Sequence, residues 1–189
     1  MGGLTQEEKK LLLQLAREAL EYGVSGKPLP LLRLEQLPPA LGEYGASFVT
    51  LTKHGNLRGC IGTLEAYQPL AEDVREHAIA AALEDYRFPP VVPAELPEIR
   101  IEVSRLTAPQ TLEYSTPDEL LTRLRPGIDG VVLRDQYRRA TFLPQVWENL
   151  PDPEQFLDQL CLKMGAPRGY WRRKPLRVEV YQVEEFHEE

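Results

Sequence analysis

The stretch SFVTLTKHGNLRGCIG, residues 47–62, gives the clearest indication of the fold. It contains two runs rich in β-branched and apolar residues, 47–53 and 57–62. The residues between them, His-Gly-Asn at 54–56, are turn formers that tolerate a positive φ. The pattern therefore predicts a β-hairpin.

The register of this hairpin depends on the length of its turn, and two alternatives stay open. An even-length turn sets Cys60 opposite Val49. A three-residue turn instead sets Cys60 opposite Thr50. Because Arg58 and Cys60 are two positions apart, regular alternation places their side chains on the same strand face.

Capping residues and apolar spacing outline the other elements. The first helix begins after Thr5, which forms a capping box with Glu8, and ends at Gly23. Pro69 is predicted at the first position of a second helix that runs to about Glu84. The remaining elements are a proline-rich loop at 25–45, strands at 99–106, 128–134 and 139–143, helices at 116–124 and 153–164, and a final strand near 176–183.

Strands and helices are interspersed without a strict βαβ rhythm, and the close-set strand pairs indicate hairpins. These features predict an α+β fold with a mainly antiparallel sheet and flanking helices. A chain of 189 residues is long enough for one domain with an apolar core, or for one domain carrying a smaller lobe. The helix and hairpin at about 112–143 form a candidate smaller lobe inserted in a larger one.

Composition excludes several classes of protein. A net charge of -7 argues against nucleic acid as a partner, because phosphate contacts require a dense basic surface. The N-terminal segment is polar, and no apolar run approaches the roughly 18 residues that suggest a membrane span, so we expect a cytoplasmic protein without membrane contact. The two cysteines and three histidines are scattered, which predicts neither a disulfide framework nor a metal site.

Cys60 is the candidate for chemistry. It lies between Gly59 and Gly62, and such small residues would let a substrate or a partner backbone approach the sulfur. The guanidinium of Arg58 would favour the thiolate, which is the reactive form of cysteine. The alternative is that Cys60 is an unreactive packing residue, since cysteine is among the most buried residue types.

A nucleophilic Cys60 would also need a base. His54 is about six residues of strand away, roughly 20 Å when extended, so direct pairing is excluded. His77 on the second predicted helix is the other candidate. Cys161 lies on a Leu/Met stripe and is interpreted as a core residue.

Two further groups of residues are candidates for binding. Asp85, Arg87 and Phe88 follow the second predicted helix, where they either line a site or form an ion pair that holds the loop. The basic stretch 168–177 either binds an anion or balances neighbouring carboxylates.

Four segments resemble, in the same order, the AMME chromosomal region domain family, also called AmmeMemoRadiSam system protein A. The hexapeptide LRGCIG at 57–62 is the most specific of them. The others are YRFPPV at 86–91, ATFLPQV at 140–146, and a segment that runs from Phe156 to Trp171. The resemblance covers nearly the whole chain.

The resemblance implies an α+β fold, with a larger lobe that contains both termini, a smaller β-containing lobe, and a cleft between them where Cys60 lies. It also implies a Memo-type protein and a radical SAM protein as partners. It implies no particular reaction or cofactor.

Two functions from different classes follow. In the first, the protein is an enzyme or enzyme subunit in which Cys60 contacts the substrate, Arg58 orients an anionic group, and Asp85 and Arg87 shape the wall. In the second, it is a non-catalytic adaptor that docks a partner through the glycine-rich hairpin and the loop at 88–90.

Overall fold

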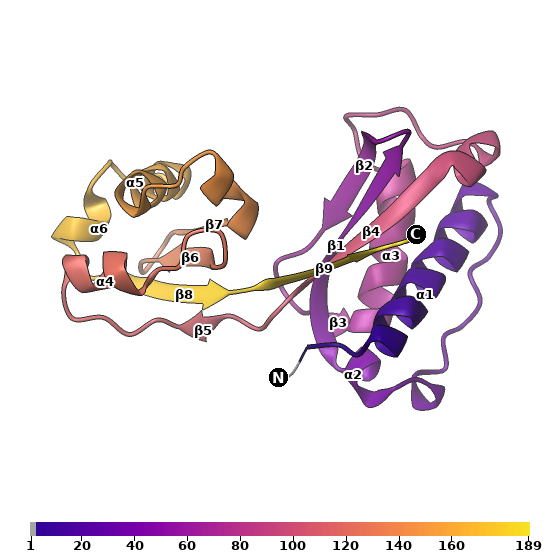
Figure 1. The fold of residues 1–189 in the computed structure, drawn as a ribbon, viewed down its shortest axis with the longest axis horizontal. Coiled ribbons are helices and arrows are strands. Elements are labelled where there is room, and N and C mark those ends of the chain that lie inside the picture. The colour runs from indigo at the N-terminus through magenta and orange to yellow at the C-terminus, as the bar shows by residue number, and fades with distance from the viewer. Residues whose placement is uncertain (1–2) are drawn as a thin grey trace. The chain divides into compact units, whose positions relative to one another are not determined.

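The computed structural model describes residues 3–189, which form two compact units (Figure 1). The first unit comprises the residues up to Leu106 together with Glu184–Glu189, and the second comprises Thr107–Val183. Both units combine antiparallel strands with helices, so the predicted α+β class is confirmed. The segment 112–143 lies within the second unit, which continues beyond it to Val183.

The first unit is built on a sheet with the strand order β2-β1-β4-β9. Strand β1 pairs in antiparallel fashion with β2, with β4 and, near its start, with the short strand β3. Strand β9 was not predicted, because the sequence pattern at the end of the chain merges it with β8 of the second unit. The bounds are Tyr44–Lys53 for β1, Asn56–Gly62 for β2, Gln68–Pro69 for β3, Ile99–Leu106 for β4 and Val183–His187 for β9.

Helices α1 (Gln6–Val24) and α3 (Leu70–Leu83) pack together and cover one face of this sheet (Figure 1). The capping box of Thr5 is present, as predicted. The predicted stop at Gly23 is wrong, because the helix continues to Val24 and the left-handed residue is Gly26, with φ +65°. Gly23 instead allows close packing, since a Cβ atom there would lie 2.9 Å from Cγ2 of Ile79.

The remaining elements of the first unit are short. The predicted loop at 25–45 contains a 3-10 turn at Leu34–Gln36, helix α2 at Pro39–Gly42 and the start of β1. Pro69 is the N-cap of α3 rather than its first residue. A second 3-10 segment, η2 (Pro93–Glu98), leads into β4. At the end of the chain, Arg17 of α1 donates to the Glu188 carboxylate.

The predicted hairpin is confirmed, and its register sets Cys60 opposite Thr50. The turn has only two residues, His54 and Gly55, with φ values of +51° and +77°. A β-bulge then shifts the pairing, and Arg58 is the extra residue of β2. The strict alternation that placed Arg58 on the face of Cys60 does not hold across this bulge.

The second unit has a sheet with the strand order β5-β8-β6-β7, in which each pair of neighbouring strands is antiparallel. Its core contains Trp147 stacked on Phe156, with 3.7 Å between ring centroids, and the fully buried Cys161. The chain enters and leaves the unit side by side, because the Thr107 N–H donates to the Gln182 carbonyl at 2.8 Å. The elements are β5 (Gln110–Thr111), α4 (Pro117–Arg123), β6 (Gly130–Arg134), β7 (Arg139–Phe142), η3 (Pro144–Glu148), α5 (Pro153–Lys163), α6 (Tyr170–Arg173) and β8 (Arg177–Tyr181).

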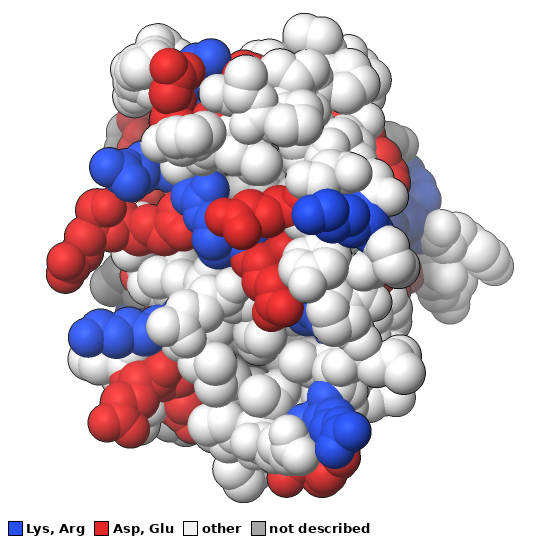
Figure 2. Space-filling model, turned by 90° about the vertical axis from the view of Figure 1, so that its right-hand side faces the viewer, with Lys and Arg blue, Asp and Glu red and all other residues white. Residues whose placement is uncertain are grey.

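On the face drawn in Figure 2, the Lys and Arg side chains of the described residues lie beside Asp and Glu side chains. This face therefore lacks the dense positive surface on which phosphate contacts depend. Over residues 3–189, no helix has both the length and the apolar character needed to cross a membrane.

Strand β2 and helix α3 meet at Gly59. A Cβ atom at this position would lie 2.0 Å from the carbonyl oxygen of Ala81, a backbone atom that cannot move alone. A Cβ at Gly62 would lie 2.4 Å from the Ser47 carbonyl oxygen. Both glycines are thus required by packing within the fold.

We expect Gly59→Ala to lower the free energy of unfolding by about 1–3 kcal/mol or more, because β2 or α3 must shift to admit the methyl group. Gly42→Ala is the matched control: its Cβ would meet no atom within 4 Å, so the change should stay within about 0.5 kcal/mol. Urea unfolding measures both. Equal midpoints for the two variants would contradict a rigid contact at Gly59.

Candidate functional site

Cys60 lies on β2, an edge strand, and its side chain is partly exposed. The neighbouring strand places Val49 and Leu51 in the core, so Thr50 between them points to the opposite face. On that face Thr50 Oγ1 donates to Cys60 Sγ at 3.2 Å. The thiol is therefore held by a hydroxyl donor, in a residue that is only partly buried.

The backbone of Cys60 is fixed by two side chains from the segment after α3. Its N–H donates to Asp85 Oδ2 at 2.9 Å, and its carbonyl accepts from Arg87 Nη2 at 3.3 Å. Arg87 in turn donates to both oxygens of Asp85, at 2.9 and 2.7 Å. These bonds form a closed ring that occupies the free edge of the strand at Cys60, a position where backbone groups would otherwise be unpaired.

The two members of this ion pair shift each other's pKa. The hydrogen bonds from Arg87 hold the pKa of Asp85 well below its usual range, against the opposing effect of burial and with a smaller contribution from the Cys60 N–H. The hydrogen bonds to Asp85 raise the pKa of Arg87, and the nearby Cys60 thiol adds a minor contribution. Asp85 is therefore a charged acceptor that positions the strand, and it is unsuited to act as a base at neutral pH.

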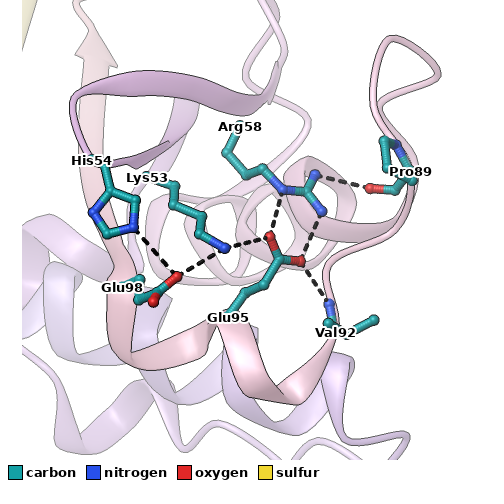
Figure 3. A network of polar contacts seen from close by, with 7 residues as sticks. All are labelled: Lys53, His54, Arg58, Pro89, Val92, Glu95 and Glu98. Atoms are coloured by element: carbon teal, nitrogen blue, oxygen red, sulfur yellow. Dashed lines mark hydrogen bonds and ion pairs between the residues drawn. The ribbon is translucent and has the colours of Figure 1, made fainter.

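Arg58 does not accompany the thiol. It donates to the Glu95 carboxylate through Nε at 3.1 Å and Nη2 at 2.9 Å, and to the Pro89 carbonyl through Nη1 at 2.9 Å (Figure 3). The bulge at Arg58 thus connects β2 to η2. Arg87 is the cation that lies next to Cys60, the place that regular alternation assigned to Arg58.

Glu95 is the centre of the network in Figure 3. It also accepts from Lys53 Nζ at 3.2 Å and from the Val92 N–H at 3.1 Å. Lys53 continues to Glu98 at 2.8 Å, and Glu98 lies 3.5 Å from His54 Nε2. His54 therefore belongs to this network at the turn of the hairpin.

The remaining candidates from the sequence are Phe88, His77 and Cys161. Phe88 is partly buried, and the Arg87 guanidinium lies 5.6 Å from its ring centroid. His77 is buried on α3, where its Nδ1 lies 3.2 Å from Asp73 Oδ2 without the alignment of a hydrogen bond. The polar neighbour of the His77 ring is therefore a carboxylate of its own helix. Burial raises the pKa of the Cys161 thiol, which fits the predicted core role.

Sequence reasoning missed two residues on the face of Cys60. Thr50 lies opposite Cys60 on one side and opposite Glu102 of β4 on the other, so a thiol, a hydroxyl and a carboxyl group lie on three consecutive strands. Burial, and then the charge of Glu185, raises the pKa of Glu102, while His187 opposes this shift. Alternation along the predicted strand 99–106 can give the face of Glu102, but only the sheet order shows that it shares a row with Cys60. Among residues 3–189 no group of three or more side chains is arranged to hold a metal ion.

The network around Glu95 predicts a pH dependence. Hydrogen bonds from Arg58 lower the pKa of Glu95 from 4.5 to about 2, with further contributions from Val92 and Lys53 and opposition from burial. Because the folded pKa lies below the unfolded one, this stabilisation is present above pH 4.5 and is lost as the pH falls towards 2. Glu95→Gln should be less stable at pH 7 and should lose less stability over that window.

Urea unfolding between pH 7 and pH 2 measures this difference. Glu18→Gln is the control, at an exposed carboxyl of α1 without an ion pair among the described residues. Parallel stability profiles for wild type and Glu95→Gln would contradict the role assigned to the network.

The comparisons with known proteins agree with this fold. The model of the AMMECR1 family matches residues 13–186. A protein of Methanothermobacter thermautotrophicus is 40% identical over 192 residues, which cover 98% of this chain and 97% of the relative. Protein MK0488 of Methanopyrus kandleri is 40% identical over 197 residues, which cover 98% of this chain and 91% of the relative.

A solved structure is also similar. The crystal structure of uncharacterized protein PH0010 from Pyrococcus horikoshii matches with a TM-score of 0.80 and 35% sequence identity. The match covers 98% of this chain and 94% of that one. The family match and the identity to these relatives together show that the chain belongs to the AMMECR1 family.

Proposed function

We propose that the protein is an enzyme or enzyme subunit whose substrate contacts the thiol of Cys60. The observation that supports this function is the contrast between the two parts of the residue. The side chain is partly exposed, whereas the N–H and the carbonyl are both held by the Asp85–Arg87 pair. A fixed backbone that presents an accessible functional group is the arrangement that precise substrate contact requires.

Each neighbour of the thiol has a distinct role in this proposal. Thr50 donates its hydrogen bond to the sulfur and so orients it. Arg87, whose side chain is 46% exposed, supplies the positive charge that an anionic group of the substrate would meet. Asp85 is a positioning residue, because its carboxylate is committed to Arg87 and to the strand.

Glu102 is the candidate for proton exchange. Its carboxyl group is partly buried and its pKa is raised, so it holds a proton at a higher pH than an ordinary glutamate. It lies two strands from Cys60, roughly 10 Å at ordinary strand spacing, in the row that passes through Thr50. A small substrate that lies across these three strands would contact both the thiol and the acid.

Alkylation by iodoacetamide tests whether Cys60 is an accessible, activated thiol. We expect Cys60 in the native protein to be modified well before the fully buried Cys161, which serves as the internal control. Thr50→Val should slow the reaction about fivefold, which corresponds to the loss of one hydrogen bond of about 1 kcal/mol. Mass spectrometry of tryptic peptides separates the two sites. If both cysteines stay inert until the protein unfolds, Cys60 is structural and the enzyme proposal fails.

A second candidate function, a non-catalytic adaptor, is supported by the loop that follows Asp85. Tyr86 is 95% exposed, and Pro89 and Pro90, further along the same loop, are exposed as well. Exposed aromatic side chains on a stiff loop are typical anchors of protein interfaces. The hairpin backbone at Cys60 is already hydrogen-bonded, so such a partner would dock on the side chains of this loop. We propose a Memo-type protein or a radical SAM protein as the partner.

Binding of purified Memo-type and radical SAM proteins, measured by calorimetry, tests the adaptor function. Tyr86→Ala should weaken binding at least about tenfold, as expected for a central aromatic anchor. Tyr137→Ala is the matched control, since Tyr137 of the second unit is 91% exposed. The adaptor function is excluded if neither protein binds, and the docking loop is excluded if both variants lose affinity equally.

A further inference from the structure

The second unit contains a cavity of about 360 Å³ that the proposed function does not use. It is formed by residues 111–115, by Pro117 and by residues 171–178, and its exposed members on the first segment are 111, 113 and 115. Its buried floor consists of Trp171, Leu176 and Val178, which belong to the apolar core of this unit. The volume lies in the lower part of the range of small-molecule sites, and the apolar floor is typical of them.

Four basic residues line the cavity, and two of them are neutralised. Arg172 forms ion pairs with Asp118 and Glu154. Arg177 forms an ion pair with Glu179 at 2.9 Å. These two residues therefore carry little net charge that a ligand could use.

The other two basic residues keep their charge. Arg173 donates only to backbone carbonyls, those of Gly169 and Arg168. The Lys174 ammonium lies 5.8 Å from the ring centroid of Tyr170. Within residues 3–189 neither one contacts a carboxylate, and the single unpaired acid that lines the cavity is Glu113. A net positive cavity in a protein of charge -7 attracts an anion that the rest of the surface repels.

We propose that this cavity binds a small phosphate monoester with a flat apolar body. Arg173 and Lys174 would bind the phosphate group, whose charge of about -1.5 to -2 at pH 7 matches two cations. The body would lie on the floor beside Trp171, against Leu176 and Val178, because the Arg172 guanidinium lies 4.4 Å from the Trp171 ring centroid. A phosphate group alone would leave most of the volume unfilled. The site is made entirely of residues of the second unit, so it does not depend on the role proposed for Cys60 in the first.

Amide and indole NMR shifts of the full chain, titrated with phenyl phosphate, test this proposal. The protein has two tryptophans, and both indole N–H groups are hydrogen-bonded, that of Trp171 to Asp158 and that of Trp147 to the Asp129 carbonyl. The signal of Trp171, which lines the cavity, should move while that of Trp147 stays in place. Amide shifts should concentrate at 111–117 and 171–178. Inorganic phosphate and phenol, each carrying half of the ligand, should both bind at least about tenfold more weakly than phenyl phosphate.

Three variants separate a built site from general attraction to positive charge. Lys174→Gln should weaken phenyl phosphate binding about tenfold, because it removes a charge-assisted bond. Arg168→Gln, at an exposed arginine of the same stretch outside the cavity, should leave the affinity unchanged. Glu113→Gln should strengthen binding by removing a repulsive charge.

The proposal is overturned if Arg168→Gln weakens binding as much as Lys174→Gln, since the attraction would then be unspecific. It is also overturned if phenyl phosphate at millimolar concentration leaves the Trp171 indole signal in place. Circular dichroism and thermal unfolding of each variant confirm that a lost signal reflects the site and not the fold.

Discussion

Strand β2 and helix α3 approach so closely at Gly59 that the Ala81 carbonyl occupies the space of a side chain. This contact fixes the edge strand against the last turn of the helix, which ends at Leu83. Asp85 follows two residues later and therefore reaches the N–H of Cys60. The position of the thiol thus depends on the absence of a side chain at the residue before it.

Two ion pairs, one on each side of this contact, hold β2 in place. Asp85 and Arg87 close the strand edge at Cys60, and Arg58 binds Glu95 of η2. All of the residues that clamp the strand come from the segment between α3 and β4. The charged residues of this segment thus stabilise the edge, and they leave the Cys60 side chain as the accessible group. Its row with Thr50 and Glu102 continues on strands that the core holds rigidly.

Local sequence patterns were sufficient to predict most helices and strands. They were insufficient to predict how the strands pair and which side chains meet. The hairpin, the capping box of Thr5 and strand β4 follow from turn chemistry and periodicity. The register did not, because a bulge compensates for the short turn, and the same bulge moves Arg58 away from Cys60.

The same limit applies to the candidate site. Cys60, Asp85 and Arg87 were identified from the sequence, but the ring that joins them is a tertiary contact over 25 residues or more. Gly59 and Gly62 were interpreted as access for a substrate, whereas packing against a helix and a neighbouring strand accounts for both. Strand β9 follows β8 after a single residue, so the sequence pattern does not show that the chain returns there to the sheet of the first unit. Because the first unit is made of two separate chain segments, it cannot be completed early in synthesis. The Arg17–Glu188 ion pair and the edge strand β9 can form only after the ribosome has translated all of residues 107–183.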